Sequence, residues 1–159
     1  MAVNRLVWFI THPDVVVDPA VPVPEWPLSE RGRRRMATMV SQPWIASIGA
    51  VWSSTERKAR ESAAMLAGHC GVVPGTMHEL GENDRSSTGY LPRDTFEALA
   101  GDFFAMPDIS VRGWERARDA QQRIIAAVTK VLASEEDTSG VAIVSHGGVG
   151  ALLLAHILR

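Results

Sequence analysis

The stretch that decides the fold is VAIVSHGGV, residues 141–149. Its first five residues form a short, largely apolar run, which is typical of a strand buried on both faces of a sheet. Gly147 and Gly148 allow a tight turn after that strand, and the apolar residues behind them predict a helix that continues to the end of the chain. A buried strand that leads directly into a helix is the repeating unit of parallel α/β sheets.

The rest of the chain repeats this alternation of strands and helices. Short apolar runs predict three further strands, at residues 5–11, 48–53 and, more weakly, 72–78. Apolar residues at helical spacing predict helices at residues 29–40, 96–104 and 114–132, and another behind a capping box formed by Ser53 and Glu56. The pattern predicts a three-layer α/β sandwich with a mostly parallel central sheet.

Length and composition limit the class of protein. A chain of 159 residues predicts a single domain, residues 1–159, although its last helix reaches Arg159 without a Gly or Asn cap and suggests a C-terminal truncation. The net charge of −2 argues against nucleic acid as a partner, and no apolar run is long enough to cross a membrane. Cys70 is the only cysteine, which excludes an internal disulfide and favours a cytoplasmic location.

Two histidines follow predicted strands. His12 ends the run LVWFIT, and His146 ends VAIVS. In open parallel sheets, ligands bind in the crevice outside the carboxyl ends of the strands, so neighbouring strands would bring both imidazoles to one crevice. A single histidine at a strand end is more often structural, but two at equivalent ends of separate strands favour a functional site.

The residues around these strand ends favour an anionic ligand. Gly147 and Gly148 open a helix whose free N–H groups and dipole attract an anion. SSTERKARESA, residues 53–63, begins a helix at the same edge of the sheet and carries two hydroxyls and three cations, although such clusters often form only a solvated helix face. Glu79 follows the weak third strand, where it is a candidate acid/base group or an ordinary surface carboxylate.

Taken in order, these motifs resemble the histidine phosphatase superfamily, the phosphoglycerate-mutase-like group. The family's VxVVSHGGV ending is nearly intact as VAIVSHGGV. Its other motifs correspond to Thr11-His12-Pro13 for Arg-His-Gly, LSERG (28–32) for LTxxG, SSTERKARESA (53–63) for SSxxxRAxxTA, and Glu115 and Arg123 for a glutamate followed eight positions later by an arginine.

The resemblance implies a phosphatase that needs no metal or other cofactor. His12 would attack phosphorus to form a phosphohistidine, His146 would donate to the phosphoryl oxygens, and Glu79 would protonate the leaving oxygen. Phosphate binding would fall to the side chains or backbone of Thr11, Ser54, Arg57, Lys58 and Gly147. The substrate would be a phosphorylated small molecule or a phosphoprotein, with a phosphomonoester or a phosphohistidine as the reacting group.

Two departures from the family pattern bear on activity. Thr11 and Lys58 stand where the family has arginines, and neither offers the planar fork that grips two phosphoryl oxygens. A hydrogen bond to a charged group contributes about 1.5–3 kcal/mol, so each loss would slow the reaction roughly 10- to 150-fold. Arg57, Arg60 or Arg85 could substitute. The alternative is a catalytically weakened or inactive member that binds an anionic ligand or a protein partner; a metal site is a third interpretation.

Overall fold

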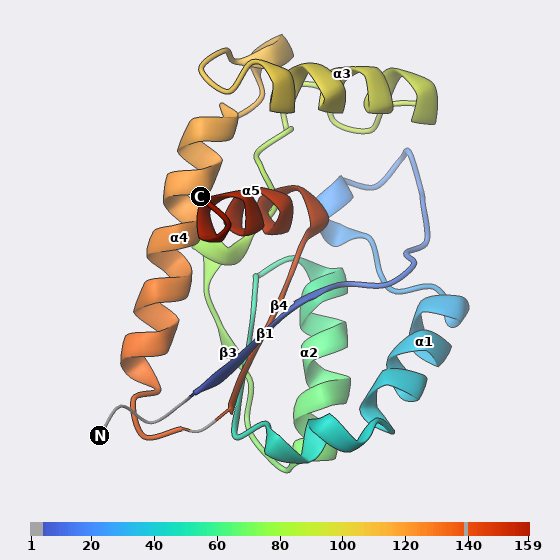
Figure 1. The fold of residues 1–159 in the computed structure, drawn as a ribbon. Coiled ribbons are helices and arrows are strands. Elements are labelled where there is room, and N and C mark those ends of the chain that lie inside the picture. Colours follow the sequence, from blue (N-terminus) through green and yellow to red (C-terminus); the bar gives the residue numbers. More distant parts are fainter. Residues whose placement is uncertain (1–4, 139) are drawn as a thin grey trace.

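A computed structural model of the chain describes residues 5–138 and 140–159. Its centre is a parallel sheet of four strands: β1 (Leu6–Thr11), β2 (Ala50–Ser53), β3 (Gly75–Thr76) and β4 (Gly140–Ser145). The strands lie in the order β1-β4-β2-β3, so the last strand of the chain is inserted between the first two (Figure 1). The stretch VAIVS thus lies in the middle of the sheet, with its residues fully buried as predicted.

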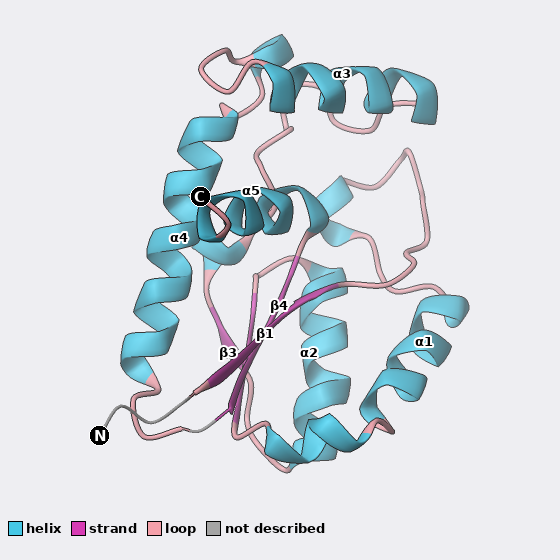
Figure 2. Ribbon diagram, in the orientation of Figure 1, coloured by secondary structure: helices cyan, strands magenta, loops and turns pink. Residues whose placement is uncertain are grey.

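Helices cover both faces of the sheet, which confirms the three-layer α/β sandwich (Figure 2). On one face, α1 (Glu30–Val40) and α2 (Arg57–Cys70) pack in one hydrophobic core with Ala142 and Val144 of β4. On the other face, α4 (Ala117–Ser134) and α5 (Gly147–Ile157) pack in a second core with Val141 and Ile143. The alternation of strand side chains between the two faces explains why successive β4 residues enter different cores. The helix α3 (Arg93–Ala105) contributes Leu99 and Phe103 to the second core.

The register of the sheet places the two histidines together. Thr11, the last residue of β1, pairs with Ser145, the last residue of β4. One residue further on, the His12 backbone N–H donates to the Ser145 carbonyl at 3.2 Å. Parallel pairing therefore brings His12 and His146 to the same edge of the sheet, although they are far apart in the sequence.

The turn between β1 and α1 requires one of the predicted glycines. Ser29 caps α1, with its Oγ accepting a hydrogen bond from the Gly32 N–H at 3.0 Å. A Cβ at Gly32 would lie 2.1 Å from the Asp14 carbonyl oxygen, so only glycine fits there. The LSERG turn thereby holds the segment that follows His12 against the start of α1.

Three expectations about element ends are corrected. Ser53 and Glu56 do not form a capping box, because the Ser53 hydroxyl donates to the Ser54 carbonyl and α2 begins only at Arg57. The third strand is reduced to Gly75–Thr76, since the preceding Pro74 has no N–H to donate to a neighbouring strand. The long helix begins at Ala117 rather than Trp114, which belongs to a loop. Within the described residues, no helix is sufficiently long and apolar to cross a membrane.

Candidate active site

The predicted pair of histidines lies at the carboxyl ends of β1 and β4. The centroids of the His12 and His146 rings are 5.2 Å apart, and the ring planes meet at 66°. His146 is fully buried, whereas His12 is partly exposed. The two imidazoles thus share one crevice, with His12 nearer to solvent.

The carbonyl of Pro13 fixes the tautomer of His12. The Nδ1 atom of His12 lies 2.9 Å from the Pro13 carbonyl oxygen, which can only accept a hydrogen bond, so Nδ1 carries the proton. Burial lowers the pKa of His12 below its ordinary value, with a smaller contribution from the nearby Lys58 charge. At neutral pH the ring is therefore an uncharged imidazole whose Nε2 lone pair is free. This is the form of histidine that can act as a nucleophile.

His146 is held from the side of α2. Its Nε2 atom lies 2.7 Å from the Ser54 hydroxyl, which also accepts a hydrogen bond from the Glu56 N–H at 3.3 Å. The Nδ1 atom is buried and has no hydrogen-bond partner within the described part of the chain. Burial lowers the pKa of His146 to about 3, so the ring is neutral at pH 7. If the Ser54 hydroxyl donates to Nε2, then Nδ1 carries the proton and is a free donor in the crevice.

Lys58 supplies an ammonium group close to both histidines, and its charge acts on the pKa of each. Its Nζ atom donates to the Val23 carbonyl at 2.8 Å and lies 2.5 Å from Oε2 of Glu56. Glu56 also approaches His146, with Oε1 at 3.6 Å from Nε2. Burial opposes ionisation of Glu56, but attraction by neighbouring positive charge, including the Lys58 ammonium, keeps the pKa of the carboxyl below its usual value. Lys58 and Glu56 therefore form a buried ion pair.

Glu82 occupies the start of α5. Its carboxylate accepts hydrogen bonds from the Gly148 N–H at 3.0 Å and the Val149 N–H at 2.9 Å. A Cβ at Gly148 would lie 2.6 Å from Oε1 of Glu82, which explains the need for glycine. The N–H groups at the start of α5 thus hold an internal carboxylate in this structure, and binding of a ligand anion at the Gly147–Gly148 turn stays a prediction.

Glu79, the predicted acid/base residue, is exposed, and its backbone carbonyl accepts a hydrogen bond from Arg123. Glu82 lies three residues later and acts on the pKa of His12, as does Glu56. The structure therefore brings Glu56 and Glu82 to the histidines.

The predicted Glu115–Arg123 pair supports the segment that carries Glu82. The Arg123 guanidinium contacts both carboxylate oxygens of Glu115, at 2.9 and 2.8 Å. It also donates to the backbone carbonyls of Glu79, Gly81 and Glu82. Arg123 thus fastens this segment to α4.

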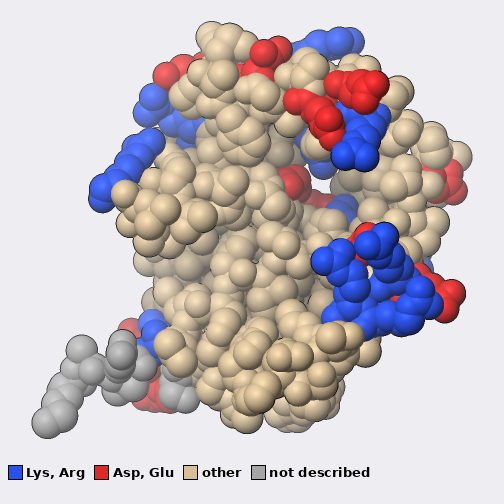
Figure 3. All heavy atoms as spheres, turned by 45° about the vertical axis from the view of Figure 1, so that its right-hand side comes forward, with Lys and Arg blue, Asp and Glu red and all other residues tan. Residues whose placement is uncertain are grey.

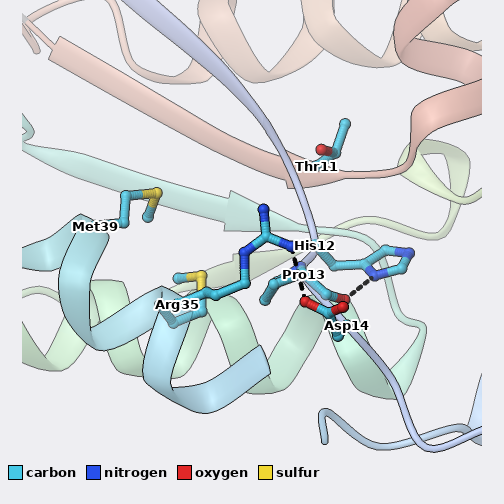
Figure 4. A pocket seen from close by; sticks show the side chains of 7 residues that line it. Thr11, His12, Pro13, Asp14, Arg35 and Met39 are labelled. Atoms are coloured by element: carbon cyan, nitrogen blue, oxygen red, sulfur yellow. Dashed lines mark hydrogen bonds and ion pairs between the residues drawn. The ribbon is translucent and has the colours of Figure 1, made fainter. Parts of the chain in front are cut away.

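Thr11 and Arg57 lie outside this group of contacts. The Thr11 side chain points away from the His12 ring, although both residues line one pocket of about 440 Å³ together with Pro13, Asp14, Arg35 and Met39 (Figure 4). Arg57 is exposed and forms an ion pair with Glu61 on the next turn of α2, at 2.9 Å. Of the five residues predicted to bind phosphate, Ser54 and Lys58 contact the core of the site, and Gly147 lies at its edge.

Most arginines near this side of the molecule are engaged elsewhere. Figure 3 shows a dense basic cluster on the surface over α1, whose sequence includes Arg31, Arg33, Arg34 and Arg35, and each of these forms an ion pair with a carboxylate. Arg85 is near enough to lower the pKa of His146 through its charge, after burial has its larger effect. Its guanidinium lies over the rings of Phe96 and Trp114, at 4.7 and 5.7 Å. In the described structure, no arginine donates a hydrogen bond to either histidine.

Sequence reasoning missed the two carboxylates of the site. Glu56 had been interpreted as a helix-capping residue, because the Ser53–Glu56 spacing matches a capping box. Glu82 lies in the irregular stretch ELGEND, where no periodicity distinguishes it from Glu79. The signal that could have identified Glu82 is chemical: a helix that opens with two glycines leaves N–H groups for a carboxylate to accept. Within residues 5–138 and 140–159, no group of His, Cys, Asp or Glu side chains is arranged to hold a metal ion.

Solved structures share the fold. A mycobacterial glucosyl-3-phosphoglycerate phosphatase superposes with a TM-score of 0.82 at 22% identity, over 97% of this chain and 79% of that chain. YhfR of Bacillus stearothermophilus gives 0.77 at 23%, over 96% and 79%, and phosphoglycerate mutase of Bacillus anthracis strain Sterne gives 0.79 at 16%, over 98% and 81%. At these identities the likeness establishes the fold alone. No curated protein sequence matches the chain.

A family model gives the assignment. The model described as histidine phosphatase superfamily (branch 1) matches residues 21–159, most of the chain. The match begins after Thr11-His12-Pro13, the motif in which the sequence departs most from the family pattern. It includes the SSTERKARESA helix and the VAIVSHGGV ending, whose residues form the crevice described above. The chain therefore belongs to the histidine phosphatase superfamily.

Proposed function

We propose that the protein is a phosphatase that hydrolyses a phosphomonoester or a phosphohistidine through a phosphohistidine intermediate on His12. The observation that carries the proposal is the hydrogen bond from His12 Nδ1 to the Pro13 carbonyl, which leaves Nε2 as the free lone pair. Pro13 thus replaces the family glycine without loss of the contact that orients the nucleophile. The lowered pKa of His12 keeps that lone pair available at neutral pH.

The first step is attack of His12 Nε2 on phosphorus, in which the bond from phosphorus to the leaving oxygen of a phosphomonoester, or to the leaving imidazole nitrogen of a phosphohistidine, breaks. Charge that develops on the phosphoryl oxygens is met by the Lys58 ammonium and, where Ser54 donates to Nε2, by the Nδ1–H of His146. An anionic oxygen at that position would give the buried Nδ1 of His146 the partner it lacks. Ser54 orients the His146 ring from behind.

Proton transfer to the leaving oxygen needs a carboxylic acid, and we assign this role to Glu82 in place of Glu79. Glu82 lies beside His12 and the start of α5, and its contacts there are with backbone N–H groups rather than with a fixed cation. Phosphoryl oxygens would compete with it for those N–H groups, which would release the carboxyl to bind a proton. In the second step the same group takes a proton from the water that attacks the phosphohistidine, and phosphate leaves.

The second candidate function is a catalytically weakened or inactive member that binds an anionic ligand or a protein partner. The observation that favours it is the charge of the crevice. Two carboxylates, Glu56 and Glu82, stand beside one ammonium, and the guanidinium of Arg85 lies over aromatic rings instead of over the histidines.

The test is phosphate release in the presence of EDTA from a panel of phosphomonoesters and a phosphohistidine peptide. We expect turnover in the wild-type protein, release at the background rate in His12→Ala, and wild-type release in His156→Ala, which changes an exposed imidazole at the far end of α5. With a substrate labelled in its phosphoryl group, acid-labile label should accumulate on the wild-type protein and on the control His156→Ala. It should not accumulate on His12→Ala. Absence of His12-dependent release from every substrate would refute the phosphatase and favour the binding protein.

A further inference from the structure

Glu56 and Lys58 form their ion pair before any ligand is bound. The side chains are 14% and 5% exposed, so neither charge is well solvated. Two of the three ammonium protons of Lys58 are directed to Glu56 and to the Val23 carbonyl. Lys58, the cation on which an anionic ligand depends, is therefore already neutralised by Glu56, which lies two residues earlier in the chain.

The other titratable groups around Glu56 do not remove this negative charge. Glu82, whose N–H donates to Oε1 of Glu56 at 3.1 Å, adds a second carboxylate. The charges of both carboxylates act on Arg123, but its guanidinium is already held by its ion pair with Glu115. His12 and His146 have lowered pKa values and are neutral at pH 7. Among the described residues, Lys58 is the cation in contact with Glu56, and Arg85, whose charge also reaches His146, lies over the rings of Phe96 and Trp114.

We propose that Glu56 is a specificity-determining residue whose carboxylate limits the negative charge of the ligand that the site accepts. The inference rests on the proposed function in taking the crevice as a phosphoryl site, but it does not require catalysis. Ligand oxygens must compete with Glu56 for Lys58, and every further negative charge on the ligand is repelled by the same carboxylate. A single phosphoryl group on a neutral or positively charged leaving group fits this site better than a bisphosphate or a phosphate beside a carboxylate.

The test is calorimetric binding of inorganic phosphate and of pyrophosphate to the full chain at pH 7, in wild type and in Glu56→Gln. Glutamine keeps an oxygen to accept from the Glu82 N–H but removes the charge. A unit charge about 5 Å from the ligand changes affinity roughly 4- to 300-fold at effective dielectric constants between that of water and 20. We expect phosphate to bind more tightly to Glu56→Gln by a factor in that range, and the gain to be larger for pyrophosphate.

Two control variants separate the effect of the Glu56 carboxylate at its own position from the effect of the protein's net charge. Glu61→Gln removes the same charge from the same helix, at a carboxylate whose partners are Arg33 and Arg57, and it should change phosphate affinity less than threefold. Glu56→Asp keeps the charge and should bind phosphate no more tightly than wild type. A purely structural role for Glu56 would predict weaker binding in Glu56→Gln.

The outcomes decide the inference independently of turnover. Equal or weaker phosphate binding by a folded Glu56→Gln protein would overturn it, as would a gain of the same size in Glu61→Gln. If Glu56→Gln does not fold, the wild-type protein still decides, because pyrophosphate binding tighter than phosphate binding would contradict a limit on ligand charge. Tighter binding without any phosphate release would support the inference while the proposed phosphatase activity fails.

Discussion

At the scale of single residues, the site depends on which nitrogen of each histidine carries a proton. For His12 the Pro13 carbonyl decides this, and the neighbouring residue needs no particular side chain to do so. For His146 the contact is with the hydroxyl of Ser54, which can donate to or accept from Nε2, so the Ser54 proton and the His146 tautomer are set together. A histidine whose tautomer is wrong presents a lone pair where a proton is needed, so each orienting contact has a chemical as well as a structural effect.

Ser54→Ala should therefore impair the function of His146 more than the fold. The loss of one hydrogen bond of about 0.5–1.5 kcal/mol corresponds to a fall of roughly 2- to 13-fold in kcat/KM. Nitrogen-15 chemical shifts of the His146 ring should report a change in the tautomer ratio. Ser53→Ala is the matched control, because Ser53 is also buried but its hydroxyl donates to a backbone carbonyl. An equal effect of both changes on the His146 shifts would contradict the orienting role.

The assignment of the acid to Glu82 is tested by comparison with Glu79. Loss of a general acid typically costs about 10²- to 10⁴-fold in rate, so Glu82→Gln should lower kcat by an amount in that range for alkyl phosphates. The loss should be much smaller for 4-nitrophenyl phosphate, whose leaving group needs little protonation. Glu79→Gln should leave both rates within threefold of wild type. If Glu79→Gln shows the leaving-group dependence instead, the role returns to Glu79.

At the scale of elements, local sequence pattern is sufficient to predict β4 and the start of α1, but it is insufficient to predict the segment between β2 and α2. VAIVS predicted β4 because a strand buried on both faces needs a continuous apolar run, and Ser29 predicted the start of α1 because its hydroxyl caps the helix. The capping box at Ser53 failed because Glu56 is drawn into the site by Lys58. Such tertiary ion pairs leave no periodic trace in a sequence.

The link between α4 and the Glu82 segment should be measurable as stability. Arg123→Met leaves Glu115 without its partner and three carbonyls without a donor, and we expect a loss of about 2–4 kcal/mol in the free energy of unfolding. Urea denaturation of wild type and variant gives this difference. Arg93→Met breaks an exposed pair between Arg93 and Glu97 on α3 and should cost less than about 0.5 kcal/mol. Similar midpoints for both variants would mean that Arg123 does not fasten the segment.

At the scale of the whole molecule, the buried histidine makes the fold sensitive to acid. The folded protein keeps His146 neutral down to its pKa of about 3, whereas the unfolded chain binds a proton near the ordinary histidine pKa of 6.5. Acid therefore favours the unfolded state throughout the interval between these values. The slope is about 1.4 kcal/mol per pH unit, so His146 alone should lower stability by about 2 kcal/mol between pH 6.5 and 5.

This prediction can be checked by urea denaturation at both pH values in wild type and in His146→Asn. The variant lacks the titrating group, so its stability should fall by about 2 kcal/mol less than that of wild type over the same interval. Carboxylates whose pKa is lowered by contacts away from His146, such as that of Asp14 beside Arg35, contribute equally to both proteins at lower pH. An identical fall in both proteins would show that His146 is not buried as a neutral ring.

The insertion of β4 between β1 and β2 has a consequence for synthesis on the ribosome. While only residues up to about 139 have emerged, β1 and β2 cannot pair with each other, because β4 lies between them in the folded sheet. The missing strand leaves a gap of roughly 10 Å between the axes of β1 and β2. Only when the last eighth of the chain is translated can the middle strand enter and bring its imidazole beside the one made first. A nascent or prematurely terminated chain that lacks β4 therefore carries a split sheet and only His12 of the histidine pair, and it exposes two strand edges that can pair with other chains.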